Sequence, residues 1–240
     1  MAINLSSGIT SAEAASAFDK DFAAKKFNVE SGVYDAIVKN VYFTPSPNNP
    51  NSNAANVVVA IGDVTLTLQH WVTYKDSGLT YKVVDGKKVL MPGMKILNSL
   101  TYVALGKVAE QCTIEPRTVK IFNYKTKQEV PTQVDAIVDM MNQPIRIAIK
   151  KVNMYKKEVV NGERVPTTTR FISNEVEKYL DTSGRTAQEK ADGTQGPVWA
   201  MAWSEKNKDK LFEEKIDTSK LINNAVAKEE PVVNEVANLF

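Results

Sequence analysis

Hydrophobic and polar positions alternate along residues 57–75, which predicts strand structure with one buried face. The apolar face carries Val64, Leu66, Leu68 and Val72, and the only histidine of the chain, His70, falls in the same register. We interpret His70 as a hydrogen-bonded core or edge residue rather than a catalytic base. The polar face carries Thr65, Thr67, Gln69, Trp71, Thr73 and Lys75.

Strand signals outnumber helix signals in the rest of the chain. β-branched and aromatic runs predict strands at 32–43, 118–124 and 144–155, and Asp85-Gly86 predicts the turn of a hairpin. The apolar spacing after Pro92-Gly93 predicts a helix ending at Gly106. We further predict helices over 10–26 and 131–141, and a loop over 44–56, where prolines and asparagines are concentrated.

The sequence pattern changes after Arg170, where it predicts short helical segments separated by Gly and Thr. Trp199 and Trp203 are four residues apart and so share a helix face. We predict a fold that is mainly β with inserted helices (α+β): an OB-like Greek-key barrel plus a C-terminal helical appendage and flexible tail. A β-sandwich is the main alternative. The predicted parts are an N-terminal helical arm (1–31), the barrel (32–170), the helical appendage packed on it (171–227) and a flexible acidic tail (228–240).

The amino-acid composition excludes several kinds of functional site. One histidine and one cysteine, Cys112, exclude His/Cys zinc clusters and internal disulfides, and neither standard phosphate-binding glycine loop is present. No secretory signal or membrane-length apolar run is visible, so we expect an intracellular setting. The net charge of +2 conceals a polarity, because residues 33–170 hold 18 Lys+Arg against 11 Asp+Glu, a net of +7. A basic body before an acidic tail favours a polyanion partner.

Basic residues interleaved with aromatic ones are the pattern that single-stranded nucleic acid needs, because lysines contact phosphates while rings stack on bases. Trp71 is the most informative position, and the pattern leaves it open as a stacking platform or a core residue. Phe122 is interpreted as core. The candidate DNA-binding residues are Lys39, Trp71, Tyr74, Lys75, Tyr81, Lys82, Lys120, Lys150, Lys151, Tyr155, Lys156, Arg164 and Arg170.

Two aspartates suggest a metal site as a minor alternative function. Asp135 and Asp139 are four residues apart on the predicted 131–141 helix and would share a face that suits Mg²⁺. Two carboxylates on a helix are more often a solvated face, so a metal-dependent nuclease is the least favoured function.

From Gly32 to about Lys208 the order of features resembles phage single-stranded-DNA-binding proteins. The stretches that carry the resemblance are SGVYDAIVKN, LMPGMKILNSLTYVALGK, TVKIFNYKTKQEVPTQVDAI, QPIRIAIKKVNMYKK, VPTTTRFISNEVEKYLD and WAMAWSEKNK. The resemblance implies an OB-type barrel that coats single strands in phage DNA replication, recombination or repair, in the cytoplasm of the infected bacterial host. It also implies an acidic tail with a terminal aromatic, here Glu229, Glu230, Glu235 and Phe240, that binds phage replication proteins.

We therefore expect a non-enzymatic, sequence-independent single-stranded-DNA-binding protein with no cofactor and no membrane partner. The alternatives are a virion or assembly protein whose β-rich body binds protein, and the metal-dependent nuclease. Oligomeric state is left open by the sequence.

Overall fold

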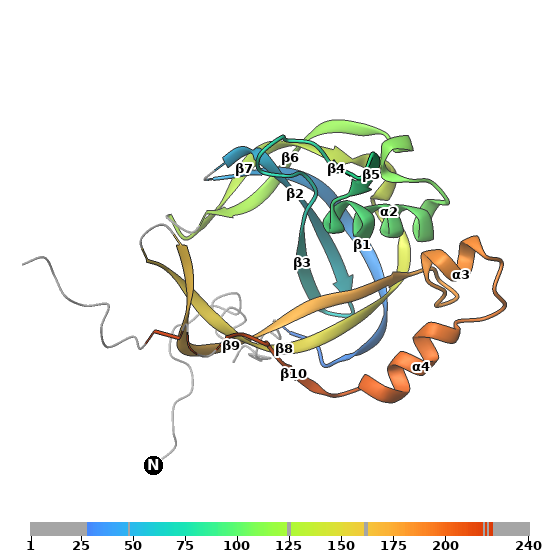
Figure 1. Cartoon of the computed structure of the whole chain (residues 1–240). Helices are drawn as coiled ribbons and strands as arrows, with labels where there is room; N and C mark the ends of the chain where they lie inside the picture. Colours follow the sequence, from blue (N-terminus) through green and yellow to red (C-terminus); the bar gives the residue numbers. More distant parts are fainter. Residues whose placement is uncertain are drawn as a thin grey trace, which may run out of the picture.

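The computed structural model describes residues 28–47, 49–123, 126–160, 163–217, 219 and 221–222. The helix expected at 10–26 and the tail at 228–240 lie outside these residues. Figure 1 shows the elements, which are β1 (Gly32–Ser46), β2 (Asn49–Ile61), β3 (Val64–Trp71), β4 (Tyr81–Val84), β5 (Lys87–Leu90), α2 (Pro92–Leu105), η1 (Ala109–Gln111), β6 (Ile114–Asn123), β7 (Gln128–Ile137), η2 (Val138–Met140), β8 (Pro144–Val160), β9 (Glu163–Leu180), α3 (Ala187–Ala191), α4 (Val198–Asn207) and β10 (Leu211–Glu213).

The described chain is mainly β, with few helices, and its main sheet is open. Eight strands belong to this sheet, in which β10, β8, β1, β2 and β3 are neighbours in that order. Strand β9 pairs with β8, and the β6–β7 hairpin joins β1 where Tyr42 pairs with Ala136. Strands β4 and β5 form a separate two-stranded sheet. Figure 1 shows the β6–β7 and β8–β9 hairpins extending from the curved central strands.

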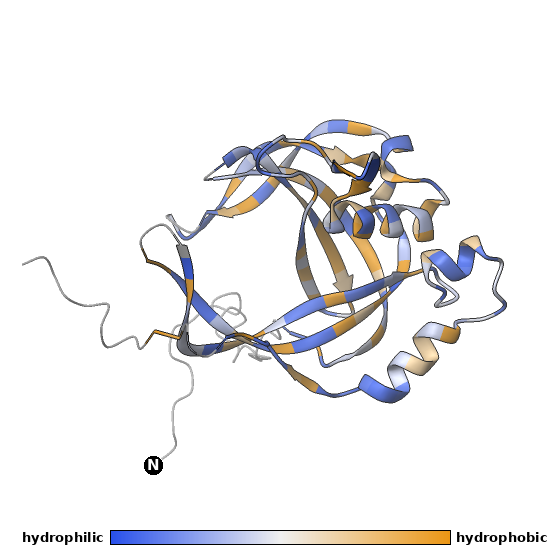
Figure 2. Cartoon of the chain, viewed as in Figure 1, coloured by the Kyte–Doolittle hydropathy of each residue, from blue (hydrophilic) through white to orange (hydrophobic). Residues whose placement is uncertain are grey.

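The core lies between the inner face of β1, β2, β3, β8 and β9 and the helix α2. Apolar side chains from α2 that are almost fully buried, such as Leu97 and Leu100, pack into the same cluster as Val57 and Ile147 of the sheet. The helix begins with Pro92 at its first turn and ends at Gly106, whose φ of 73° and N–H bond to Tyr102 form the expected left-handed cap. Figure 2 shows hydrophobic and hydrophilic residues alternating along the strands that surround this core.

A buried side-chain hydrogen bond links the two strands at the ends of the five-stranded core. The imidazole Nε2 of His70 on β3 lies 2.9 Å from the Tyr179 hydroxyl on β9, and both residues are buried. The rings also meet edge to face, with centroids 5.9 Å apart. The prediction that His70 is a hydrogen-bonded core residue is confirmed.

The alternation predicted for β3 is confirmed from residue 64 to residue 72, because Leu66 and Leu68 are buried while Thr67 and Gln69 are exposed. The pattern ends with the strand, and Thr73, expected on the exposed face, is buried. Its hydroxyl donates a hydrogen bond to the Asn51 carbonyl and accepts one from the Asn53 N–H. The hairpin turn at Asp85-Gly86 is also confirmed, and both residues have the positive φ that this type of turn requires.

The loop prediction for residues 44–56 is wrong, because β1 runs to Ser46 and β2 begins at Asn49. Asparagines favour turns when their side chains bond to nearby backbone. Here Asn56 instead donates across the strand pair to the Thr44 hydroxyl at 2.8 Å. Cross-strand pairing therefore outweighs local turn propensity.

The helix prediction for residues 131–141 is wrong as well, since β7 extends to Ile137 and only a 3-10 turn follows. Val134 and Ala136 are spaced by two and are buried together beside Tyr42 in a small second core. Pro131 pairs with Lys120 of β6 and is distant from the β1 contact, so its missing N–H is tolerated at this edge.

Residues 171–180, expected at the start of a helical appendage, continue β9 as strand. They pair with residues 146–154 of β8, and this long-range pairing outweighs the helix-favouring Glu and Lys residues of the segment. Among the described residues, α-helices follow at α3 and α4. Trp199 and Trp203 share a face of α4, as their spacing predicted, and their rings stack with centroids 5.8 Å apart. Across the described ranges, no helix has the length and apolarity to span a membrane.

Candidate nucleic-acid interface

Ten of the thirteen candidate residues fall into two groups. The hairpin cluster, at the end of β3 and on the β4 strand that follows, consists of Trp71, Tyr74, Lys75, Tyr81 and Lys82. The strand-pair cluster, on β8 and β9, consists of Lys150, Lys151, Tyr155, Lys156 and Arg170. The sequence pattern does not distinguish the two clusters, but their side-chain environments differ.

Trp71 is not a core residue, because 38% of its surface is exposed and it points away from the face that holds His70. Trp71 pairs with Ala54 of β2, which pairs in turn with Thr44 of β1, so the three residues lie in one row across this outer face. The neighbouring level on the same face is polar, since Gln69 donates to Asn56 at 3.3 Å and Asn56 donates to Thr44. An indole beside amides and a hydroxyl on a sheet surface is suited to stack on an unpaired base.

The backbone of Trp71 is held tightly on its other side. A Cβ added to Gly93, at the start of α2, would lie 2.0 Å from the Trp71 carbonyl oxygen. The next residue, Val72, donates its N–H to the Asn53 carbonyl at 2.9 Å. The helix and the β1–β2 hairpin therefore fix the end of β3 that presents the indole.

Lysines lie over the two tyrosine rings of the hairpin cluster. The Lys82 ammonium is 5.9 Å from the Tyr74 ring centroid, and the Lys88 ammonium is 4.5 Å from that of Tyr81. Within the described residues, none of Lys75, Lys82 and Lys88 forms an ion pair with a carboxylate. These cations therefore keep their charge available for an anionic ligand.

The strand-pair cluster has the opposite electrostatic character, because each of its four cations has a carboxylate partner. Those partners are Glu177 for Lys150, Glu30 for Lys151, Glu158 for Lys156 and Glu213 for Arg170. The guanidinium of Arg170 also covers the Tyr155 ring, 4.4 Å from its centroid. The cations and the ring of this cluster are thus already engaged within the chain.

Glu214 strengthens this internal neutralisation. Its carboxylate accepts hydrogen bonds from the Tyr155 N–H and from the Lys157 ammonium, both at 2.8 Å. Burial alone would raise the pKa of Glu214, but these two bonds and the nearby cations outweigh it and hold the pKa below its usual value. The carboxylate is therefore ionised at neutral pH beside the strand-pair cluster.

The three remaining candidates do not join either cluster. Lys39 is exposed at a bulge of β1, and Arg164 is exposed near the start of β9. Lys120 is exposed on β6, and the register from Tyr42 through Ala136 puts it on the face of the sheet opposite to Trp71. Phe122 shares that face and is 48% exposed, so the prediction that it belongs to the core is wrong. The tail candidates Glu229, Glu230, Glu235 and Phe240 lie outside the described residues.

Sequence reasoning missed Lys87 and Lys88, which lie on β5 of the same hairpin as Tyr81 and Lys82. They follow the Asp85-Gly86 turn directly and pair with Val84 and Val83 of β4. The signal was present, because a two-residue turn fixes which residues face each other across a hairpin. Lys88 is two residues before Leu90, the partner of Tyr81, so its side chain lies on the same face as that ring.

His70 does not contribute chemistry to this surface. Burial lowers the pKa of its imidazole to about 4, so the ring is neutral at pH 7, and its partner is the Tyr179 hydroxyl. Asp135 and Asp139 do not share a helix face, because the first lies on β7 and the second on a 3-10 turn, where it accepts a hydrogen bond from the Thr113 N–H. In the part of the chain that the structure describes, no group of three His, Cys, Asp or Glu residues is arranged to hold a metal.

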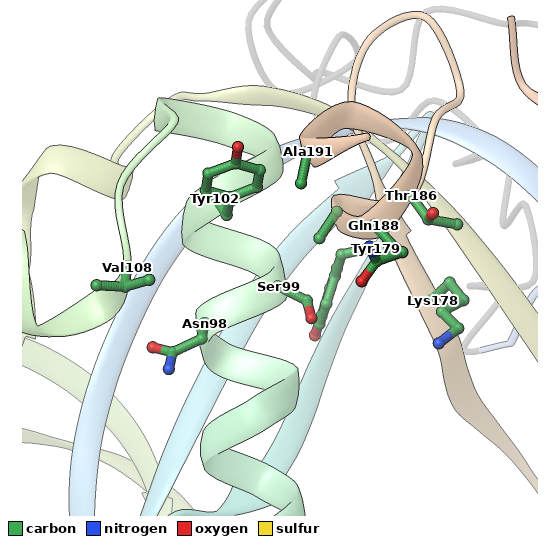
Figure 3. A pocket seen from close by; sticks show the side chains of 10 residues that line it. Asn98, Ser99, Tyr102, Val108, Lys178, Tyr179, Thr186, Gln188 and Ala191 are labelled. Atoms are coloured by element: carbon green, nitrogen blue, oxygen red, sulfur yellow. The ribbon is translucent and has the colours of Figure 1, made fainter. Parts of the chain in front are cut away.

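A separate cavity of about 420 Å³ lies between α2, the end of β9 and α3. Its lining includes Asn98, Ser99 and Tyr102 of α2, and Figure 3 shows Ser99 on the side of the helix that faces Tyr179. Asn98 accepts a hydrogen bond from the Ala109 N–H, and Ser99 donates to the Lys95 carbonyl. Because these polar groups already have partners within the fold, we assign this cavity to helix packing.

No protein-family model matches the chain, and no curated protein matches it. The geometry above therefore carries the functional argument.

Proposed function

We propose that the chain is a non-enzymatic, sequence-independent single-stranded-DNA-binding protein that acts in phage DNA replication, recombination or repair. The observation that supports the proposal is the exposed Trp71 on the outer face of β3, followed along the chain by lysines that form no ion pair with a described carboxylate. The hairpin cluster, together with Lys87 and Lys88, is the proposed principal contact.

An OB-like barrel is the fold we infer behind this surface. The order β3-β2-β1-β8-β9 gives five core strands, and the His70–Tyr179 hydrogen bond spans the gap between the first and last of them. OB folds are five-stranded, partly open barrels that bind oligonucleotides on the face of their second and third strands. Trp71 lies on the outer face of β3, which is the third of these five strands in chain order, and this position supports the assignment.

Each part of the hairpin cluster has a role in this proposal. The indole of Trp71 stacks on a base, which is tolerant of sequence because every base has a π-face. The ammonium groups of Lys75, Lys82, Lys87 and Lys88 contact phosphates and displace counterions. Tyr74 and Tyr81 offer further ring surface next to those cations. Duplex DNA does not present unpaired bases and so gains only the phosphate contacts.

Titration of the full chain with labelled oligo-dT and with a duplex of equal length tests the proposal. If the four hairpin lysines each neutralise one phosphate, at about 0.7 per contact, log K for oligo-dT falls against log[salt] with a slope near −3. We expect much weaker duplex binding. Equal affinity for duplex and single strand contradicts the proposal, and failure to bind either DNA favours the assembly-protein alternative. Incubation of the same DNA with Mg²⁺ reports any nuclease activity.

A further inference from the structure

Helix α4 and strand β10 border a second, open cavity of about 380 Å³ on the outer side of β8 and β9. Its position follows from the alternation of β8, because Lys150 lines the cavity while Ile149 points into the core on the other face. Three aromatic side chains line it, from Trp199 and Trp203 of α4 and from Phe212 of β10. Neither tryptophan is among the candidate DNA-binding residues of the sequence.

The aromatic walls are held in place by the fold. The indoles of Trp199 and Trp203 stack nearly parallel, at 18°, and Trp203 is buried behind the half-buried Trp199. The backbone N–H of Trp199 donates to the Glu189 carboxylate at 2.7 Å, which ties the start of α4 to α3. Phe212 is positioned by parallel pairing of β10 with Val152 of β8.

Polar groups converge on the same cavity. Lys150 and Glu177 form an ion pair in its lining, and the Lys150 ammonium lies 5.4 Å from the Phe212 ring centroid. Lys206 also lines it, is exposed, and forms no ion pair with the described residues. Asn207 adds an amide. An apolar side chain would offer no partner to Lys206 or Asn207, whereas a nucleotide has an aromatic face, polar base edges and a phosphate.

We propose that this cavity binds one nucleotide of single-stranded DNA, with the base against the aromatic walls and the phosphate at Lys206. The inference rests on the proposed function and adds a second contact to it. The hairpin cluster is level with Thr44 of β1, whereas the cavity lies beyond Gly32, which pairs with Ile149. At about 3.3 Å per residue, that stretch of β1 spans up to about 40 Å. We therefore expect a long oligonucleotide, and not one of a few nucleotides, to contact both sites.

The test measures binding of fluorescein-labelled oligo-dT to the full chain by anisotropy at low salt. One OB fold covers roughly 4–16 nucleotides. The short oligonucleotide, of about 5 nucleotides, is near the lower end of this range, and the long one, of about 25 nucleotides, exceeds its upper end. Trp199→Ala is expected to weaken the long oligonucleotide about tenfold and to leave the short one unchanged. Met201→Ala, on an exposed residue of the same helix that does not line the cavity, is the matched control.

Lys206→Gln provides a second variant that removes no core contact. It is expected to lower affinity for the long oligonucleotide about threefold and to reduce the magnitude of the salt slope by about 0.7. Thermal melting checks the fold of each variant. If Trp199→Ala is unstable, the affinity and salt slope of Lys206→Gln test whether the cavity binds DNA. If a folded variant binds the long oligonucleotide as tightly as the unaltered chain does, the inference is overturned. The cavity would then suit an aromatic side chain of a protein partner instead. Failure of the unaltered chain to bind either oligonucleotide overturns the proposed function as well.

Discussion

The hairpin cluster and the strand-pair cluster have the same kind of sequence, lysines interleaved with aromatic residues, but they are in different electrostatic states. Lys75 and Lys82 have no carboxylate partner among the described residues, and Lys82 lies over the Tyr74 ring. Lys151 and Arg170 are each paired with a glutamate. A basic stripe in a sequence therefore does not by itself define a phosphate-binding surface.

The difference arises from where the partners come from. Glu30 and Glu213, which pair with Lys151 and Arg170, are distant from them in sequence and reach them only because β10 and the segment before β1 lie against β8. Lys82 of the hairpin cluster instead lies on the separate two-stranded sheet, and neither it nor Lys75 forms an ion pair with a described residue. Topology thus decides which cations remain available to a ligand.

The largest expected effect concerns the support of the hairpin cluster. Gly93→Ala should lower the free energy of unfolding by about 3 kcal/mol, because its Cβ would lie 2.0 Å from the Trp71 carbonyl oxygen and backbone must move. Gly62→Ala is the control, since nothing lies within 4 Å of its Cβ and its φ of 54° costs only about 1 kcal/mol. Urea unfolding measures both, and equal effects would show that the end of β3 is not tightly packed.

Replacing one ring in each cluster compares their roles in stacking. Trp71→Ala should weaken oligo-dT binding by about 2 kcal/mol and leave the protein folded, because the indole lies outside the hydrophobic core and is 38% exposed. Tyr155→Ala should cost less than about 0.5 kcal/mol, since the Arg170 guanidinium already covers that ring. Fluorescence anisotropy with labelled oligo-dT measures both affinities. A larger loss in Tyr155→Ala would reverse the assignment of the principal contact.

Acidification is expected to destabilise the sheet that supports the hairpin cluster, because the buried His70 is neutral in the folded protein. The folded pKa of His70, about 4, lies below the ordinary value of about 6.5, so the unfolded chain takes up the proton first as pH falls. The stability from neutral His70 is complete above about pH 6.5 and is lost between about pH 6.5 and pH 4. Between pH 7 and pH 5 this amounts to about 2 kcal/mol.

Urea unfolding at the two pH values measures this loss, with His70→Gln as the control that has no imidazole to titrate. The control should be less stable at pH 7 and should depend less on pH in this range. If both proteins lose the same free energy between pH 7 and pH 5, carboxylates rather than His70 determine the acid sensitivity.

The smallest expected effects come from neutralising two cations in each cluster. Lys75→Gln with Lys82→Gln should weaken oligo-dT binding about tenfold at low salt and reduce the magnitude of the salt slope by about 1.4. Lys151→Gln with Arg170→Gln should change the slope by less than about 0.5, because those cations are already neutralised by Glu30 and Glu213. Equal changes in the two double variants would mean that DNA displaces the glutamates.

Much of the fold was predictable wherever local pattern and tertiary pairing agree. The period-two alternation of β3, the Asp85-Gly86 turn and the Gly106 cap each follow from side-chain or backbone geometry over a few residues. Prediction failed where distant partners decided the structure. The segments 44–56 and 131–137 became strands because β1, β2, β6 and β7 pair with one another, and pairing energy exceeds the turn or helix propensity of a short segment.

The sequence by itself determined which residues can stack and carry charge, and it determined that Trp71 and His70 lie on opposite faces of one strand. Only the tertiary structure decided which cations remain unpaired, which ring is covered by an arginine, and that Trp199, Trp203 and Phe212 surround one cavity. The physical reason is that electrostatic neutralisation and enclosure depend on groups brought within a few ångströms by long-range strand pairing. Such distances have no signature in the local order of residues.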